Sequence, residues 1–387
     1  MTFTKPTPTT LQAGLNILPS RINGMGAVFI VYKFAALKET PGYRGVSHLA
    51  EHLLYKAIDD VSAEMDANGI DANAFTGDDV VVFMLSGLDD RVELFQKKFL
   101  SIIDFVPTEE MFDIEKDIVF QEYNMSASRQ NFISNNVMRV YFDYYSAIGK
   151  KEDIEELTYA NFIAFIERYR RPFAIVRYGA LNGISEHARH VEYSHSPNIP
   201  ELKRGFNPEN AVSLASFPNS MITLAWRSFK TYEIDPRDLE LIGMMWTNGL
   251  TSPLMNEIRE KRGLSYGMAM YSNTFGSTVI NGFWCLCNPD KGETVDKLFI
   301  KMTSNWRKWL TESRFNNTLD CMKCANRIAE LTEFADIETY IDPWAINNSY
   351  LESVTWDRIV NVLTKIQDTE WTFCSSAETN IFEEPNV

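Results

Sequence analysis

A helix-and-strand pattern occurs twice in this chain of 387 residues, once in each half. The first copy, LTYANFIAFIERYRRPFAIVRYGAL, begins at Leu157, and the second, SVTWDRIVNVLTKIQDTEWTFCSSAE, begins at Ser353. With an offset of about 197 residues, Thr158 aligns with Thr355. Each copy has the apolar spacing of an amphipathic helix followed by a strand. Any two helix–strand units can look alike, so a second match is needed to favour a duplication.

That second match lies earlier in each half. GAVFIVYKFAAL from Gly26 resembles SMITLAWRSFK from Ser220. The segment between the halves, SHSPNIPELKRGFNPENA, is rich in Pro, Asn and Ser, as linkers are. We therefore predict a first domain at 1–195, a linker at 196–210 and a second domain at 211–387. Because helices and strands mix without a βαβ rhythm, the predicted class is α+β: two homologous sandwich domains in tandem, each a mostly antiparallel sheet with helices on one face.

The composition excludes several partners. The net charge is −15 and no Lys/Arg-rich block occurs, so neither nucleic acid nor a membrane surface is an expected partner. The N-terminal segment has no apolar core of a signal peptide, and the longest apolar stretches are too short to span a bilayer. An odd number of cysteines, 5, favours reduced thiols, so we expect a cytoplasmic protein.

The stretch SHLAEHLLYK carries two histidines and a glutamate within one predicted helical turn. His48 and His52 are spaced i and i+4, so both rings leave the same helix face. Glu51 lies close enough to reach a water held between the rings. These groups are the working parts of a zinc hydrolase, and the order H-x-x-E-H is the inverzincin motif. The alternative is a pair of surface histidines on a solvated helix.

A catalytic zinc needs a third protein ligand, and the segment PTEEMFDIEKDIVFQEYNM offers one. Thr108 is the predicted N-cap of a helix there. Glu115 and Glu122 fall two turns apart beside an apolar stripe, where a carboxylate is costly unless it is paired or bound to metal. We predict that Glu122 is the third ligand and that Glu115 holds a ligating histidine. Alternatively, both turn to the solvent edge of the stripe, which comprises Met111, Ile118 and Met125 with Ile114 at its border.

These motifs together resemble the pitrilysin-like zinc peptidases, above all the short two-domain members related to mitochondrial processing peptidase. In that family a glutamate ligand ends an E-x-x-x-x-x-x-E stretch, which here is EKDIVFQE from Glu115 to Glu122. The resemblance implies one Zn²⁺ per chain, held by His48, His52 and Glu122. The spacing from His52 to Glu122 is shorter than is usual in the family, and no ligand is lost.

Two further segments match the family. NGIDANAFTGDD supplies Asn73 and Ala74, and the resemblance implies an edge strand on which a peptide substrate pairs as an added strand. From the residues alone, the favoured interpretation of Asn73 is an ordinary turn residue before a strand at Val80–Leu85. TNGLTSPLMNEIREKRGLSYGM supplies Arg259 and Tyr266, which the resemblance makes a pair that binds substrate carbonyls and supports the transition state. The alternative is an arginine paired with a neighbouring glutamate and a tyrosine in the core.

The family arrangement gives the functional prediction. In two-domain members the Arg/Tyr pair comes from the partner subunit across a clamshell, so we expect a homodimer with active sites completed in trans. We predict a zinc-dependent endopeptidase that hydrolyses peptides or processes short polypeptides inside that chamber, with Glu51 as general base. The alternative is a non-catalytic, zinc-containing peptide-binding or assembly subunit, which the intact catalytic positions disfavour.

Two other groups of residues resemble metal sites. A C-x-C in a predicted strand and a C-x-x-C in a predicted helix could imitate a four-thiolate site, but buried structural thiols are favoured. Those cysteines are Cys285, Cys287, Cys321 and Cys324. Three histidines before the linker are interpreted as a solvated helix end rather than a second metal site. They are His187, His190 and His195.

Overall fold

The computed structural model describes residues 13–18, 24–125, 137–179, 193, 207, 221–332 and 344–375. The chain divides into two compact units. The first comprises Met1–Ser126, Tyr145–Pro200 and Ala329–Ile341, and the second comprises Ala127–Tyr144, Glu201–Ile328 and Asp342–Val387. Of the predicted linker, only residue 207 is described, and the three histidines before it lie outside the described residues.

This division differs from the predicted boundaries in two places: Ala329–Ile341 is grouped with the first unit, and Ala127–Tyr144 is grouped with the second. Aromatic packing gives the physical reason for the second difference. The rings of Tyr141 and Phe142 lie 4.7 and 5.8 Å from the ring of Trp226. Tyr144 packs in the same way on Phe275, with ring centroids 5.3 Å apart. A short segment of the first half of the sequence therefore belongs to the core of the second unit.

The first unit contains one five-stranded sheet with the order β1-β5-β2-β4-β3. Neighbouring strands are antiparallel except for the parallel outer pair β1 and β5. Among the described residues, strand β3 forms one edge of the sheet and pairs with β4. The strands are β1 (Gly14–Leu18), β2 (Met25–Tyr32), β3 (Asp71–Thr76), β4 (Val81–Leu88) and β5 (Ala174–Tyr178).

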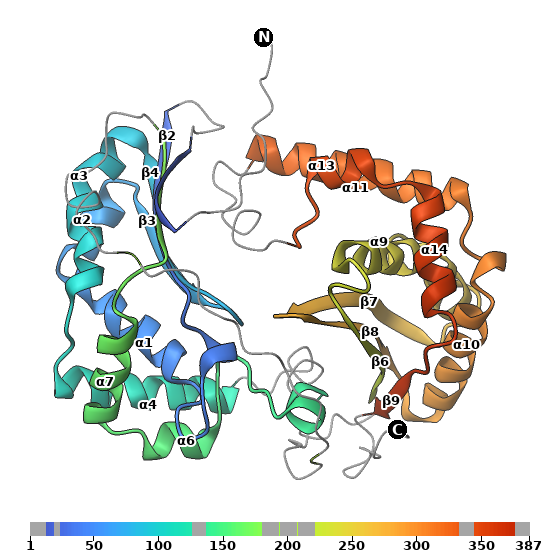
Figure 1. Cartoon of the computed structure of the whole chain (residues 1–387), viewed down its shortest axis with the longest axis horizontal. Helices are drawn as coiled ribbons and strands as arrows, with labels where there is room; N and C mark the ends of the chain where they lie inside the picture. Colours follow the sequence, from blue (N-terminus) through green and yellow to red (C-terminus); the bar gives the residue numbers. More distant parts are fainter. Residues whose placement is uncertain are drawn as a thin grey trace. The chain divides into compact units, whose positions relative to one another are not determined.

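The helices of the first unit gather on one face of this sheet (Figure 1). Val28, Ile30 and Tyr32 of β2 point into that core, and the alternate residues of the strand are buried on the opposite face. Burial on both faces explains the continuous apolar run of β2. The helices are α1 (Val46–Tyr55), α2 (Ser62–Ala67), α3 (Asp89–Phe99), α4 (Glu109–Met125), α6 (Lys151–Glu156) and α7 (Tyr159–Tyr169).

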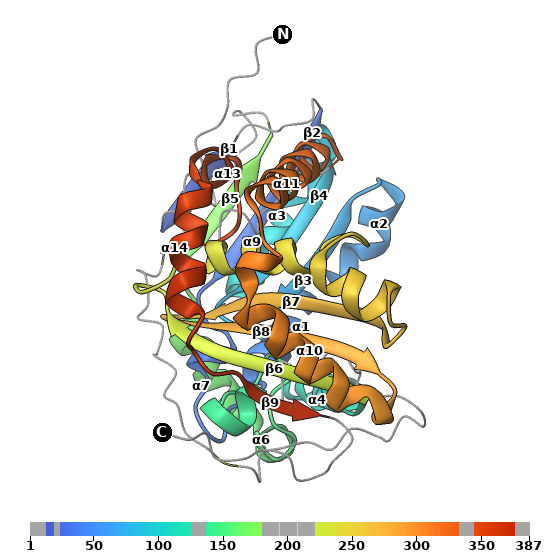
Figure 2. The ribbon, with the colours of Figure 1, turned by 90° about the vertical axis from the view of Figure 1, so that its right-hand side faces the viewer.

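The second unit contains a four-stranded antiparallel sheet with the order β7-β8-β6-β9 (Figure 2). Strands β7 and β8 form a hairpin whose two-residue turn begins with Gly276 at φ 59°, a conformation that favours glycine. The strands are β6 (Met221–Lys230), β7 (Ser265–Phe275), β8 (Thr278–Cys287) and β9 (Thr372–Ser375).

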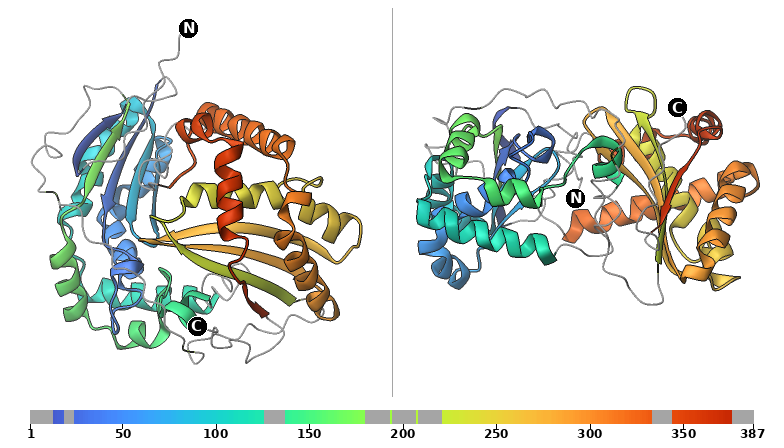
Figure 3. Two further views of the ribbon diagram at one scale, coloured as in Figure 1. Left: turned by 45° about the vertical axis from the view of Figure 1, so that its right-hand side comes forward. Right: turned by 90° about the horizontal axis from the view of Figure 1, so that it is seen from below.

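Helices of the second unit also pack on one face of their sheet (Figure 3). Phe283 of β8 stacks on Phe299 of the helix above it, with ring centroids 4.2 Å apart and planes 10° apart. The helices are α9 (Pro236–Thr247), α10 (Gly292–Ser304), α11 (Glu312–Thr332), α13 (Asn348–Ser353) and α14 (Trp356–Ile366). None of the helices in the described part of the chain combines the length and hydropathy that a bilayer crossing requires.

The two units repeat one topology. The order β5-β2-β4-β3 in the first corresponds to β9-β6-β8-β7 in the second. Helices α7 and α14 precede equivalent strands, and each is capped by a threonine: Thr158 accepts the Asn161 N–H at 3.2 Å and Thr355 accepts the Arg358 N–H at 3.3 Å. The predicted α+β class with two homologous sandwich domains is therefore confirmed.

The cysteine prediction is correct for one pair and wrong for the other. Cys285 and Cys287 are buried on β8, as expected. Cys321 and Cys324 lie on α11, but both are exposed, so they are not core thiols. The helix was predicted correctly, and the error lies in which of its faces is buried.

Candidate active site

Helix α1 presents His48, Glu51 and His52 on one side, because its other side is held in the core by Leu49 and Leu53. The helix begins after Gly45, which has φ 99°. A carboxylate from the preceding loop fixes this end: Glu39 accepts the N–H of Gly45 at 2.7 Å and the N–H of Ser47 at 2.8 Å. An acidic group at a helix N-terminus also complements the helix dipole.

The ring nitrogens of the two histidines converge. His48 Nε2 and His52 Nε2 are 3.2 Å apart, and the rings are nearly perpendicular at 88°. Glu122 Oε2, from α4, lies 3.5 Å from the first nitrogen and 3.7 Å from the second. Among the described residues this is the one group whose side chains could jointly hold a metal ion, with ligand atoms within 4.8 Å of one another.

The donor set and its spacing fit zinc. Zinc takes imidazole nitrogen and carboxylate oxygen at about 2.0–2.2 Å, which places neighbouring ligand atoms of a tetrahedral site roughly 3.3–3.5 Å apart. The three separations in the cluster lie close to this range. Burial, with a smaller contribution from the charge of His52, lowers the pKa of His48 to about 4. His48 is therefore neutral at neutral pH, as metal ligation requires.

Glu115 contacts the cluster through His52. Its side chain is 4% exposed, and its Oε2 lies 3.0 Å from His52 Nδ1. Its other oxygen pairs with Lys56 Nζ at 2.9 Å. A carboxylate at Nδ1 favours the tautomer that donates there, which leaves the Nε2 lone pair free for a metal. This is the contact that the sequence predicts for Glu115.

The predicted apolar stripe of α4 is wrong in its details. Ile114, Ile118 and Met125 are exposed. The buried face instead comprises Phe112, Glu115 and Val119. A buried carboxylate replaces an apolar residue on that face because His52 and Lys56 satisfy both of its oxygens. The predicted N-cap is observed, since the Met111 N–H donates to Thr108 Oγ1 at 3.2 Å.

Glu51 lies beside the cluster and contributes no ligand atom to it. Its Oε2 accepts a hydrogen bond of 2.6 Å from Thr76 Oγ1. Burial raises the pKa of Glu51, and the charge of Glu122 adds to this effect, while the Thr76 hydrogen bond and His52 oppose it. Glu51 is thus a carboxylate with enhanced proton affinity next to the convergent nitrogens.

Three contacting residues carried no predicted role: Glu39, Lys56 and Thr76. Thr76 could have been found, because it belongs to the same NGIDANAFTGDD segment as Asn73. Lys56 is spaced i and i+4 from His52 and so shares its helix face. For Glu39 the sequence offers no signal, because its contacts depend on the turn that leads into α1.

Asn73 and Ala74 lie on the edge strand β3, so the alternative of an ordinary turn asparagine is wrong. The Asn73 side chain is exposed, and its Oδ1 accepts the Ala74 N–H at 2.8 Å. On the same strand the Ala72 carbonyl accepts a 2.7 Å hydrogen bond from Tyr55 Oη at the end of α1. The edge strand is therefore fastened directly to the helix that carries the two histidines.

Arg259 and Tyr266 lie in the second unit and contact each other. Arg259 belongs to the π-helical residues Met255–Glu260, and its guanidinium lies 4.7 Å from the centre of the Tyr266 ring. Tyr266 sits in a β-bulge at the start of β7 and is 79% exposed, so it does not fill the core. Arg259 Nε also lies 3.2 Å from Glu260 Oε1, as the alternative interpretation anticipated.

Comparisons with known proteins match both the sequence and the fold. Residues 180–318 match the family model described as the peptidase M16 inactive domain, a segment that includes Arg259 and Tyr266. A relative from Rickettsia felis, named an uncharacterized zinc protease, is 24% identical over 395 residues, which cover 92% of this chain and 93% of the relative.

Two solved structures share the fold. A protease from Helicobacter pylori superposes with a TM-score of 0.76 at 16% identity and covers 95% of this chain and 98% of its own. A peptidase M16 inactive domain from Pseudomonas fluorescens gives 0.73 at 15% identity, covering 95% and 96%. With the H-x-x-E-H residues converging on Glu122, these matches show that the chain is similar to peptidases of the M16, or pitrilysin-like, family.

Proposed function

We propose that this protein is a zinc-dependent endopeptidase. One observation carries the proposal: His48 Nε2, His52 Nε2 and Glu122 Oε2 converge within 4.8 Å, and Glu51 stands beside them without joining the ligand set. A purely structural zinc site closes all its positions with protein ligands. Three ligands and an adjacent free carboxylate are instead the arrangement of a hydrolytic site.

The chain's own residues account for the proton transfers. Zinc held by His48, His52 and Glu122 would supply Lewis acidity to a water molecule and to the scissile carbonyl. Glu51 accepts the proton of the attacking water and returns it to the leaving amine. Its raised pKa brings its proton affinity closer to that needed near neutral pH, and Thr76 fixes the direction of its carboxylate.

The edge strand offers a place for the substrate. An extended peptide can add to the outer edge of β3 by backbone hydrogen bonding, displacing the Asn73 side chain from the Ala74 N–H, with Asn73 and Ala74 next to the cleaved bond. The exposed phenol of Tyr266 and the guanidinium of Arg259 are suited to bind carbonyl oxygens of that peptide. We propose that this pair acts in trans within a homodimer, and that the peptidase works in the cytoplasm.

The substitution Glu51→Gln tests the proposal against a non-catalytic, zinc-containing peptide-binding subunit. We expect hydrolysis of an unstructured peptide to fall about 10²–10⁴-fold while the variant still purifies with zinc, because the base is lost and the ligands are kept. Glu93→Gln, on the exposed surface of α3, serves as the matched control. A chelator should abolish wild-type cleavage and added zinc should restore it.

Two results would contradict the proposal. If the wild-type protein binds zinc and peptide but shows no cleavage in any member of a peptide library, the non-catalytic alternative holds. If Glu51→Gln folds but loses its zinc, Glu51 is a ligand rather than a base.

A further inference from the structure

A partly enclosed cavity of about 310 Å³ lies within the second unit. Residues of strands β6, β7 and β9 and of helices α9, α10 and α14 line it. Polar and apolar groups contribute about equally to its wall, and the apolar part includes Trp246, Trp306, Trp371, Ile242 and Met270. This volume is at the small end of the range for ligand pockets. A compact apolar molecule would fit it.

Arg227 of β6 lines the same cavity and is only 7% exposed. Its Nε donates to Asn281 Oδ1 at 3.1 Å, and its Nη1 donates to the Ile366 carbonyl at the end of α14 at 2.7 Å. Its guanidinium also lies 4.0 Å from the centre of the Trp371 ring. Within the described part of the chain, Nη2 has no hydrogen-bond partner and no carboxylate pairs with Arg227.

A buried arginine without an anion is unusual. Elsewhere in the chain, the buried Arg177 pairs with the carboxylate of Asp89. For Arg227 the compensation comes from the face of the Trp371 ring and from the partial negative charge at the C-terminus of α14, both of which are weaker than a full charge. Burial lowers the pKa of Arg227 to about 9, as expected for a desolvated cation. An anion that enters the cavity would supply the opposite charge that Arg227 lacks and would accept a hydrogen bond from its guanidinium.

The surroundings of Arg227 select among anions. Asp368 and Glu370 also line the cavity and are exposed, which places two negative groups near its mouth. They disfavour ligands with a second negative charge, such as a phosphate ester. We propose that this cavity is a binding site for a small apolar molecule with one carboxylate, which pairs with Arg227 while the apolar body lies against the tryptophans.

Calorimetric titration of the full chain tests the proposal with three related probes: 3-phenylpropanoate, L-phenylalanine and the neutral 3-phenylpropanamide. We expect 3-phenylpropanoate to bind and the amide to bind at least about tenfold more weakly, since it lacks the charge. L-phenylalanine distinguishes two sources of the ligand. If L-phenylalanine binds more tightly than 3-phenylpropanoate, the site is assigned to free amino acids, whose ammonium would meet Asp368 or Glu370. If it binds more weakly, the site is assigned to acids without an amine.

Variants separate this cavity from the histidine cluster. Arg227→Met should weaken the binding of 3-phenylpropanoate at least about tenfold. Arg227 also donates a hydrogen bond to the end of α14, so a second variant is needed that leaves this contact intact. Ile300→Glu is that variant. Ile300 is exposed on α10 and lines the cavity, so a carboxylate there repels the ligand. Leu94→Glu is the control, because it also replaces an exposed apolar residue by glutamate but lies in the first unit. His52→Ala must leave binding unchanged.

Several results would overturn the proposal. They are the absence of carboxylate binding at millimolar concentration, equal binding of acid and amide, loss of binding in His52→Ala, or Ile300→Glu binding as tightly as Leu94→Glu.

Discussion

Two glutamates near the histidines differ in their surroundings, and this separates their roles. Glu115 has both oxygens occupied, by His52 and by Lys56, so it orients the His52 ring and is not free to move protons. Glu51 has one oxygen held by Thr76, and burial raises its pKa. A raised pKa beside a metal site is typical of a general base. Residue type alone does not distinguish the two, but their partners do.

Replacing Glu115 by glutamine should weaken zinc binding by about 10–100-fold, because the carboxylate that fixes the His52 tautomer is lost. The measurement is the zinc dissociation constant by competition with a chromophoric chelator. Glu109→Gln, on the exposed first turn of the same helix, is the control and should leave affinity unchanged. Unchanged affinity in Glu115→Gln would show that His52 is oriented by its helix alone.

Removing the Thr76 hydroxyl should shift the pH dependence of cleavage. Its hydrogen bond stabilises the ionised form of Glu51 and so lowers the pKa of that group. Glu51 acts as a base only when ionised, so the rate falls as pH drops through its pKa. Thr76→Val therefore moves the acid limb of kcat/KM to higher pH, whereas Thr40→Val, at an exposed position, leaves it in place. A limb that moves to lower pH contradicts the role given to Thr76.

At the scale of elements, helix α4 shows how far sequence reasoning reaches. The N-cap Thr108 and the seven-residue spacing of Glu115 and Glu122 are local signals, and both glutamates do lie toward α1. The buried face could not be predicted from apolar residues, because Glu115 occupies a core position that only His52 and Lys56, distant in sequence, make tolerable. Local patterns predict elements, whereas tertiary partners decide which face is buried.

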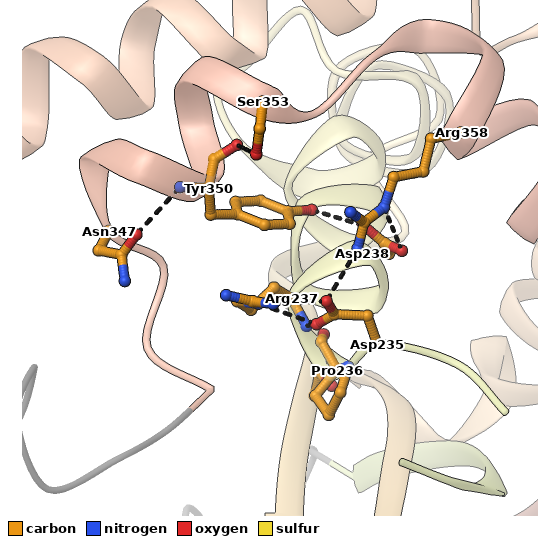
Figure 4. A network of polar contacts seen from close by, with 9 residues as sticks. Asp235, Pro236, Arg237, Asp238, Asn347, Tyr350, Ser353 and Arg358 are labelled. Carbon is orange, nitrogen blue, oxygen red and sulfur yellow. Dashed lines mark hydrogen bonds and ion pairs between the residues drawn. The ribbon is translucent and has the colours of Figure 1, made fainter. Parts of the chain in front are cut away.

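A buried polar network ties three helices of the second unit together (Figure 4). Asp238 of α9 accepts hydrogen bonds from Tyr350 Oη of α13 at 2.8 Å and from Arg358 Nε of α14 at 3.0 Å. Arg358 also reaches Asp235, the N-cap residue of α9, at 2.8 Å. The carboxylate of Asp238 is thus the shared acceptor on which α13 and α14 meet α9.

Asp238→Ala should lower the free energy of unfolding by about 2–3 kcal/mol, since it leaves the Tyr350 hydroxyl buried without its acceptor and removes a partner of the partly exposed Arg358. Urea denaturation followed by circular dichroism measures the change. Asp320→Ala, at an exposed position of α11, is the matched control. Equal effects of the two substitutions would show that the network contributes nothing to stability.

At the scale of the whole molecule, the two units repeat one topology but carry different candidate site residues. The strand order and the capped helices repeat, so both halves were predictable from one pattern. The site residues do not repeat: His48, His52 and Glu122 belong to the first unit, while Arg259 and Tyr266 belong to the second. The position of residues 137–144 in the second unit could not be predicted, because it depends on aromatic contacts with Trp226 and Phe275.

This separation allows a test of whether the halves of one site come from different chains. Glu51→Gln removes the base from the first unit, and Tyr266→Phe removes the phenolic hydroxyl from the second. In a homodimer with sites completed in trans, a mixed dimer has one site with both groups intact and one with neither. Random pairing of equal amounts then leaves about a quarter of all sites intact.

We therefore expect cleavage by the co-refolded mixture to rise well above the sum of the two variants alone, toward about a quarter of the wild-type rate. Native mass spectrometry establishes that mixed dimers are present. Mixing either variant with Asp320→Ala, which keeps both groups, calibrates the rate expected from half-active dimers. If mixed dimers form and the rate stays at the sum of the variants, each chain completes its own site, and the proposed trans arrangement is wrong.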